Sequence, residues 1–136
     1  MDSNSQSETA VVEVIDLSVG YSHSPVLKDL NFSVSKGEIF VILGASGCGK
    51  STLLKNLIGL IPPIKGHIYI KGREITTPDT KSKIEIMKQF GVLYQSGALF
   101  NSLTLEENIT LVLEEHSDIP AKERPRVAAE KLALVG

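Results

Sequence analysis

The sequence predicts an α/β fold, and three consecutive segments in its first half carry that prediction. Residues 39–43 (IFVIL) are apolar without interruption and contain β-branched side chains, which is typical of a central strand covered on both faces. The glycine-rich stretch GASGCGKST follows directly at 44–52. From Lys50 onward, apolar side chains recur at helical spacing until Pro62 and Pro63 end the pattern. Strand, glycine-rich turn and helix in this order indicate an α/β unit.

Further strands are expected on both sides of this unit. Residues 11–19 form the first patterned segment of the chain. In residues 26–38 (VLKDLNFSVSKGE), apolar and polar side chains alternate, which predicts a half-buried strand that ends in a turn at the Lys-Gly pair. Short strands are also expected at 66–72 and at 92–94.

Helices are expected in the second half of the chain. The polar segment 79–90 reads as a helix, and Thr104 with a glutamate three residues later is a capping-box signal for a helix through about His116. Pro120 suits the start of a last helix, but Pro125 also lacks a backbone donor, so the first turn is expected at or after Pro120.

Composition and charge describe an ordinary globular domain. The chain has 136 residues, of which 42% are hydrophobic and 22% charged, and this length suits one domain with its own core. A net charge of −2 provides no basic footprint for nucleic acid. Cys48, the single cysteine, has no partner for an internal disulfide. Residues 1–9 read as a disordered polar tail without the features of a signal peptide, and no apolar run approaches the roughly 20 residues that span a bilayer. We therefore expect a cytoplasmic chain whose membrane role, if any, comes through a partner.

The glycine-rich stretch fits the phosphate-loop pattern G-x-x-x-x-G-K-[ST] without a mismatch, from Gly44 through Ala45, Ser46, Gly47, Cys48, Gly49 and Lys50 to Ser51. Glycines let the backbone turn its N–H groups toward phosphate oxygens, and the start of the following helix adds partial positive charge. Lys50 would reach the β- and γ-phosphates, the Ser51 hydroxyl would complete a Mg²⁺ shell, and Thr52 would contact the α-phosphate. Cys48 is either a reactive thiol at a helix N-terminus or a residue without a special role, at a position where the motif accepts any amino acid.

Over residues 11–136 the chain resembles the opening half of an ATP-binding cassette (ABC) transporter ATPase subunit. YSHSPVLKDLNFSVSKGEIFVILGASGCGKSTLLKNLIGLIPPIKGHIYIKG and GVLYQSGALFNSLTLEENI carry the resemblance. It implies a P-loop NTPase fold of the ABC type, with an antiparallel β-subdomain and an incomplete parallel core sheet. It also implies that Tyr21 stacks on adenine and that Gln95 touches Mg²⁺ and the attacking water. Tyr21 could instead be a half-exposed tyrosine that only packs at a strand end.

The stretch QSGALFNSLTLEENI is similar to lipid-handling cassettes that work with mammalian-cell-entry-type substrate-binding proteins. The resemblance implies a second nucleotide-binding subunit as partner, and a transmembrane permease contacted through the loop after Gln95. That loop carries Leu99 and Phe100, which suit a partner's short cytoplasmic helix but could also tuck into their own core. The subunit would lie at the inner face of the cell membrane.

Several parts of such an ATPase have no match in this sequence. LVLEE at 111–115 resembles a Walker B strand, but its apolar residues share one helical face behind Thr104. No signature motif or switch histidine can be assigned, and His23, His67 and His116 read as solvated or loop residues. We therefore expect residues 10–136 to be the N-terminal portion of one nucleotide-binding domain, truncated before the signature motif and Walker B, with the general base outside this chain.

Two functions of different classes remain open from the sequence. The parent chain is an ATPase that powers transport, of phospholipid by the resemblance, or the chain is a module that holds nucleotide without turnover. A kinase or GTPase with the same phosphate loop is a further alternative, although no NKxD guanine reader is found in the sequence. The unpaired edges expected of its central strand predict marginal stability or self-association.

Overall fold

The computed structural model describes residues 10–21, 24–76 and 80–136, in two compact units, Met1–Phe90 and Gly91–Gly136. Each unit is considered by itself. The polar tail expected at 1–9 and His23 lie outside the described residues.

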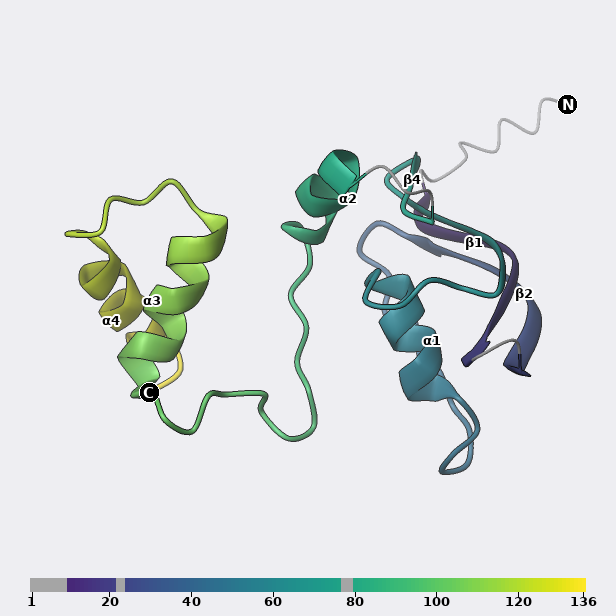
Figure 1. Cartoon of the computed structure of the whole chain (residues 1–136), viewed down its shortest axis with the longest axis horizontal. Coiled ribbons are helices and arrows are strands. Elements are labelled where there is room, and N and C mark those ends of the chain that lie inside the picture. Colours follow the sequence, from purple (N-terminus) through teal and green to yellow (C-terminus); the bar gives the residue numbers. More distant parts are fainter. Residues whose placement is uncertain (1–9, 22–23, 77–79) are drawn as a thin grey trace, which may run out of the picture. The chain divides into compact units, whose positions relative to one another are not determined.

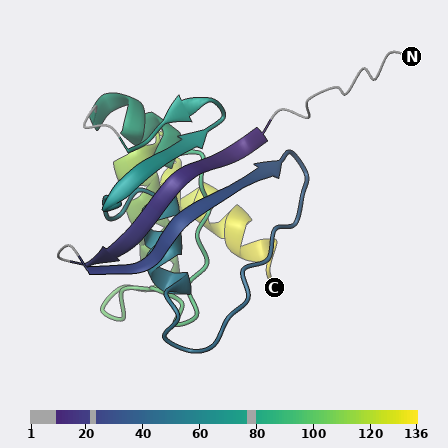
Figure 2. The same ribbon diagram turned by 90° about the vertical axis from the view of Figure 1, so that its right-hand side faces the viewer.

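A four-stranded antiparallel sheet of order β2-β1-β3-β4 is the main feature of the first unit (Figure 1). Strand β1 (Ala10–Tyr21) pairs with β2 (Ser24–Ser35) on one side and with β3 (Lys65–Ile70) on the other, and the short β4 (Arg73–Glu74) forms the far edge. Figure 2 shows β1 and β2 running side by side along their length. The antiparallel subdomain predicted from the sequence is confirmed.

Helix α1 (Lys50–Leu57) contributes Leu53 to a buried apolar cluster beside this sheet. Its other members come from β1, β3 and the segments after them: Val14, Leu17, Val19, Ile68, Ile70, Ile75 and Ile86. Burying side chains of this size contributes roughly 1.5–3 kcal/mol each, so the cluster fixes α1 and the glycine-rich loop before it against the sheet. The helix ends before the two prolines, because the Leu60 N–H bonds the Lys55 carbonyl at 2.8 Å and closes a C-terminal turn.

Helix α2 (Thr80–Met87) confirms the helix expected near 79–90, and Ile86 anchors it in the cluster. None of the helices among the described residues has the length and apolar character that crossing a membrane requires.

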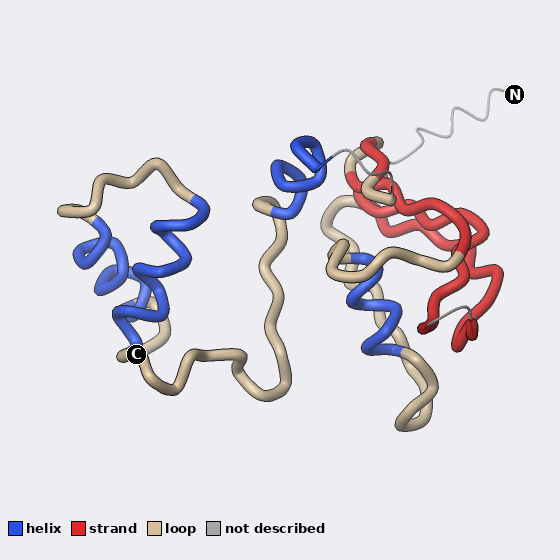
Figure 3. The backbone as a smooth tube through the Cα atoms, in the orientation of Figure 1, coloured by secondary structure: helices blue, strands red, loops and turns tan. Residues whose placement is uncertain are grey.

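The strands predicted at 39–43 and 92–94 are wrong for this structure. Both segments are loops (Figure 3), and Ile39, Leu43 and Leu93 are 89%, 87% and 92% exposed. A strand forms by hydrogen bonding to a neighbouring strand, and no described strand pairs with either segment. The sheet of the described residues is therefore wholly antiparallel, and the parallel core sheet implied by the resemblance is not formed there.

The second unit contains helices α3 (Leu105–His116) and α4 (Arg124–Ala133). The capping box at the start of α3 is confirmed: the Glu107 N–H bonds the Thr104 hydroxyl at 3.2 Å, and the Thr104 N–H bonds the Glu107 carboxylate at 2.7 Å. The Thr104 backbone N–H, and after it the Thr104 hydroxyl, hydrogen-bond the Glu107 carboxyl and hold its pKa below the ordinary value of 4.5. The Walker B look-alike at 111–115 lies inside α3 and is helical, as its periodicity predicted.

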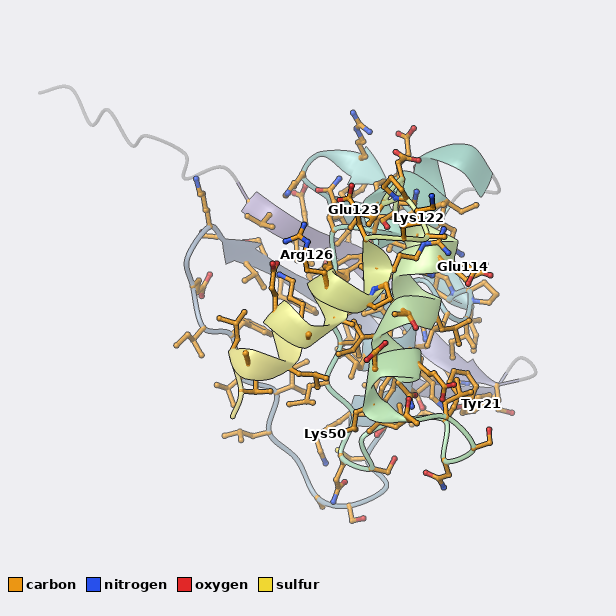
Figure 4. All side chains as sticks on the ribbon, turned by 90° about the vertical axis from the view of Figure 1, so that its left-hand side faces the viewer. Tyr21, Lys50, Glu114, Lys122, Glu123 and Arg126 are labelled. Atoms are coloured by element: carbon orange, nitrogen blue, oxygen red, sulfur yellow. The ribbon has the colours of Figure 1, made fainter. Side chains whose placement is uncertain are left out.

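An ion pair ties the two helices of this unit together. The Arg124 guanidinium lies 3.4 Å from the Glu114 carboxylate and also donates to the Ile119 carbonyl at 3.0 Å. Figure 4 shows Glu114 on α3 and, on the α4 side, Glu123 and Arg126. The last helix, α4, begins at Arg124, which confirms the prediction that its first turn lies at or after Pro120.

Candidate nucleotide-binding loop

The glycine-rich loop joins the end of the exposed 39–43 segment to the first turn of α1. Gly47 and Gly49 have φ angles of 80° and 101°, in the left-handed region that glycine adopts without steric cost. Between them, the Cys48 N–H bonds the Ala45 carbonyl at 3.3 Å and closes a turn. A Cβ on Gly49 would lie 2.8 Å from Cγ1 of Val26, so this position also needs a residue without a side chain.

The start of α1 has the features of an anion site. Gly49, the N-cap residue, makes no side-chain cap, and the first turn contains no acidic residue. The N–H groups of a first helical turn have no partner within the helix and carry partial positive charge. Neither a side-chain cap nor a carboxylate in the first turn therefore competes with an anion at this helix end.

Lys50 lies across this loop. Its Nζ donates to the carbonyl oxygens of Gly44 and Ala45, each at 2.7 Å, and is 3.6 Å from the Cys48 Sγ. The structure thus places a positive charge among the loop residues, where the sequence pattern predicted it.

Ser51 and Thr52 differ in exposure. Ser51 is exposed, so its hydroxyl can reach a ligand, whereas Thr52 is 8% exposed and its carbonyl accepts from the Asn56 side chain at 2.8 Å. Among the described residues no cluster of three or more His, Cys, Asp or Glu side chains could hold a metal ion. The donors available at this site fit a cation that takes most of its ligands from phosphate and water, as Mg²⁺ does.

Tyr21 is the last residue of β1 and pairs with Ser24 at the start of β2. Its side chain is exposed, at 53%, so a face of the ring is open to a ligand. Tyr21 and Lys50, both in the first unit, are labelled in Figure 4 and lie apart from one another in that view.

Gln95, Leu99 and Phe100 belong to the second unit. Gln95 is exposed in a turn that the Gly97 N–H closes on the Tyr94 carbonyl at 3.1 Å. Leu99 and Phe100 are 56% and 60% exposed, so the alternative that they tuck into their own core is wrong. The geometry of the phosphate loop is thus built by the first unit alone, and the role of Gln95 at it stays a prediction.

Sequence reasoning missed two buried asparagines. Asn56 of α1 is 1% exposed, and its Oδ1 has no hydrogen-bond partner among the described residues. Asn108 of α3 is 8% exposed and bonds the turn before the helix. Asparagine is a poor residue for helix interiors because its amide competes for backbone groups, and that property was the available signal.

The pattern G-x-x-x-x-G-K-[ST] at the start of α1, with Lys50 folded over the loop, indicates a P-loop NTPase as the class of protein. Comparison with known proteins then narrows the class. The sequence profile described as ABC transporter matches residues 27–136. The chain therefore belongs to the ABC transporter family, and the kinase and GTPase alternatives are set aside.

Individual relatives agree with this assignment. The chain is 42% identical over 125 residues to the probable ribonucleotide transport ATP-binding protein mkl of Mycobacterium tuberculosis, covering 92% of this chain and 35% of that protein. It is 34% identical over 126 residues to the intermembrane phospholipid transport system ATP-binding protein MlaF of Haemophilus influenzae, covering 93% of this chain and 48% of that protein. The chain thus spans between a third and a half of the length of these relatives.

Solved structures show the same fold. The dimeric structure of an ATP-binding cassette in a post-hydrolysis state, bound to ADP and Pi, aligns with a TM-score of 0.76 at 28% identity. The alignment covers 88% of this chain and 54% of that one. The α/β cassette fold expected from the sequence is thus confirmed, although its core strands are not formed in the described residues.

Proposed function

We propose that this chain binds MgATP through Gly44–Thr52, as the N-terminal portion, residues 10–136, of an ABC nucleotide-binding domain. The observation that carries the proposal is the position of Lys50, whose Nζ lies 2.7 Å from the carbonyls of Gly44 and Ala45 at a helix start without a side-chain cap. A cation and free N–H groups at one loop form a site for the phosphates of a nucleotide.

The residues of the site take different parts in this proposal. Backbone N–H groups of Gly44, Ala45, Ser46, Gly47, Cys48 and Gly49 surround the phosphates. Lys50 neutralises the β- and γ-phosphates, Thr52 contacts the α-phosphate through its backbone N–H, and the Tyr21 ring stacks on adenine. Ser51 and Gln95 are the protein ligands proposed for Mg²⁺, which when bound neutralises phosphate charge.

Nucleotide binding by Lys50→Ala tests this proposal. A fluorescent ATP analogue should bind the wild-type chain, and Lys50→Ala should weaken that binding by about 10- to 150-fold, because a charge-assisted contact to phosphate contributes about 1.5–3 kcal/mol. Lys55→Ala removes a lysine from the other end of the same helix and is the matched control. Equal binding by the wild type and Lys50→Ala would contradict the assignment.

Adenine preference tests the role of Tyr21. If the ring stacks on the base, Tyr21→Ala should weaken ATP binding by about 5- to 150-fold, as expected for a base–aromatic stack of about 1–3 kcal/mol. Tyr69→Ala, on β3, is a control for loss of a tyrosine. Unchanged ATP and GTP affinities in Tyr21→Ala would count against the stacking contact.

We further propose that the whole protein hydrolyses ATP to power transport. In that account Lys50, Ser51 and Gln95 stabilise charge at the γ-phosphate, and the general base comes from outside these residues. Turnover measurements on the 136-residue chain separate this account from a chain that carries its own base. Sustained hydrolysis that Lys50→Ala abolishes would show that the base lies within the chain.

The proposed partners are a second nucleotide-binding subunit and a transmembrane permease at the inner face of the cell membrane. Exposure of Leu99 and Phe100 supports a permease contact after Gln95, because exposed apolar side chains close together mark interaction surfaces. Membrane recruitment of the full-length protein should fall in Phe100→Ala.

Phospholipid is the substrate class that we propose. Similarity to MlaF supports it, while similarity to the mkl protein favours ribonucleotides. The full-length protein, reconstituted with its permease in vesicles, should show ATPase activity that responds to the phospholipid composition of the vesicle. A response to added ribonucleotide alone would favour the second class.

A further inference from the structure

The side chain of Asn108 closes the turn that precedes α3. Its Nδ2 donates to the carbonyl oxygens of Thr104, Phe100 and Leu103 at 2.9, 3.2 and 3.3 Å. Its Oδ1 accepts the Phe100 N–H at 2.8 Å. The amide is 8% exposed, so both of its ends are used within the turn and almost none of it meets solvent.

Phe100 is held by its backbone while its ring points into solvent. Asn108 bonds both the N–H and the carbonyl of Phe100, and the Leu103 N–H bonds the same carbonyl at 3.0 Å. The Phe100 side chain is nevertheless 60% exposed, next to an exposed Leu99 and near an exposed Leu105. A turn fixed before docking loses less conformational entropy when a partner binds.

We infer that Asn108 is a positioning residue that fixes Phe100 for contact with a cytoplasmic segment of the permease. The inference rests on the proposed function, which assigns the contact to Leu99 and Phe100, and it adds the residue that sets their geometry. Glu106 and Glu107 in the first turn of α3 lie beside this apolar group in the sequence and are exposed. The partner segment is therefore one with apolar side chains next to basic ones, and the acidic border disfavours an anionic lipid surface.

A double-mutant cycle on the full-length protein tests whether Asn108 acts through Phe100. The measured quantity is binding to inverted vesicles of the source cell's cytoplasmic membrane, with liposomes of the lipids extracted from that membrane as the second arm. Phe100→Ala removes an apolar contact, and Asn108→Ala removes the two hydrogen bonds that hold the Phe100 backbone. Each variant should therefore weaken vesicle binding by about tenfold. The double variant should bind no more weakly than Phe100→Ala.

Control variants distinguish the positioning of Phe100 by Asn108 from a general loss of structure. Asn101→Ala changes another asparagine of the same loop and should bind vesicles as the wild type does. Hydrogen exchange at the Phe100 amide should speed up in Asn108→Ala, and binding of a fluorescent ATP analogue should be unchanged. If Asn108→Ala loses α3 helicity, Asn108→Asp replaces it in the cycle, because it keeps the oxygen that accepts the Phe100 N–H and removes the amide donors.

Four results would overturn the inference. Asn108→Ala could bind like the wild type, or weaken binding by its full factor in the Phe100→Ala background, which would show that it does not act through Phe100. Liposomes could bind as well as membrane vesicles, which would make the surface a lipid contact. A wild type that binds nucleotide but no vesicles would remove the permease contact, and the inference with it, while leaving the nucleotide site intact.

Discussion

At the residue scale, Gly49 and Gly47 give the phosphate loop its shape under different constraints. Both have a positive φ, but a Cβ on Gly49 would lie 2.8 Å from Val26 and 3.1 Å from Leu27, whereas a Cβ on Gly47 meets no heavy atom within 4 Å. Gly47→Ala should therefore lower the free energy of unfolding by about 1 kcal/mol, and Gly49→Ala by about 1 kcal/mol more. Urea unfolding of both variants measures the difference. Equal losses would show that the side chains of β2 move aside at no cost.

Glu74 makes the first unit sensitive to acid. Its carboxylate accepts from His67 at 2.6 Å and from the Thr76 hydroxyl, and these hydrogen bonds hold its pKa below the ordinary value of 4.5. A carboxyl whose pKa is lowered on folding stabilises the protein above its unfolded pKa, and the contribution is lost as the pH falls through the folded value. Glu74→Gln should therefore be less stable than the wild type at pH 7, with the difference closing below about pH 4.5. Thermal unfolding across this range measures it, with Glu115→Gln as a control for the loss of one negative charge.

At the scale of the element, α3 depends on its first turn. The capping box of Thr104 and Glu107 satisfies N–H groups that the helix itself leaves free. Thr104→Ala should lower the free energy of unfolding of the second unit by about 1 kcal/mol, as other N-cap replacements do. Thr110→Ala is the matched control, because the Thr110 hydroxyl bonds back to the Glu107 carbonyl within the helix and takes no part in the cap. Helicity at 222 nm in a urea titration reports both, and equal midpoints would show that the cap contributes nothing.

At the scale of the whole molecule, the exposed apolar segment at 39–43 governs solution behaviour. Ile39 and Leu43 are almost fully exposed, and no described strand pairs with their backbone. Exposed apolar segments drive association, so the average mass of the 136-residue chain should rise with protein concentration in sedimentation experiments. Ile39→Lys with Leu43→Lys should reduce this rise. Ser102→Lys adds charge elsewhere and should not, and a chain that stays monomeric throughout would refute the expectation.

The sequence by itself determined the phosphate loop, because its chemistry is written in consecutive residues. Gly44 to Ser51 specify the turn, the cation and the helix start together, and the capping box at Thr104 is equally local. The phosphate loop and the capping box depend on φ angles and hydrogen bonds between residues close in the sequence, so they do not require a particular arrangement of the rest of the chain. The alternation over 26–38 predicted the strand at β2, whereas its antiparallel pairing with β1 was implied by the family resemblance.

Only the tertiary structure showed that residues 39–43 form a loop and that Asn108 bonds the backbone of Phe100. A strand requires partners distant in the sequence, so apolar composition alone could not tell that 39–43 stays a loop. The bonds of Asn108 reach back eight residues to Phe100, a contact that no periodicity encodes. The exposure of Leu99 and Phe100, which supports the proposed permease contact, likewise depended on how the chain packs.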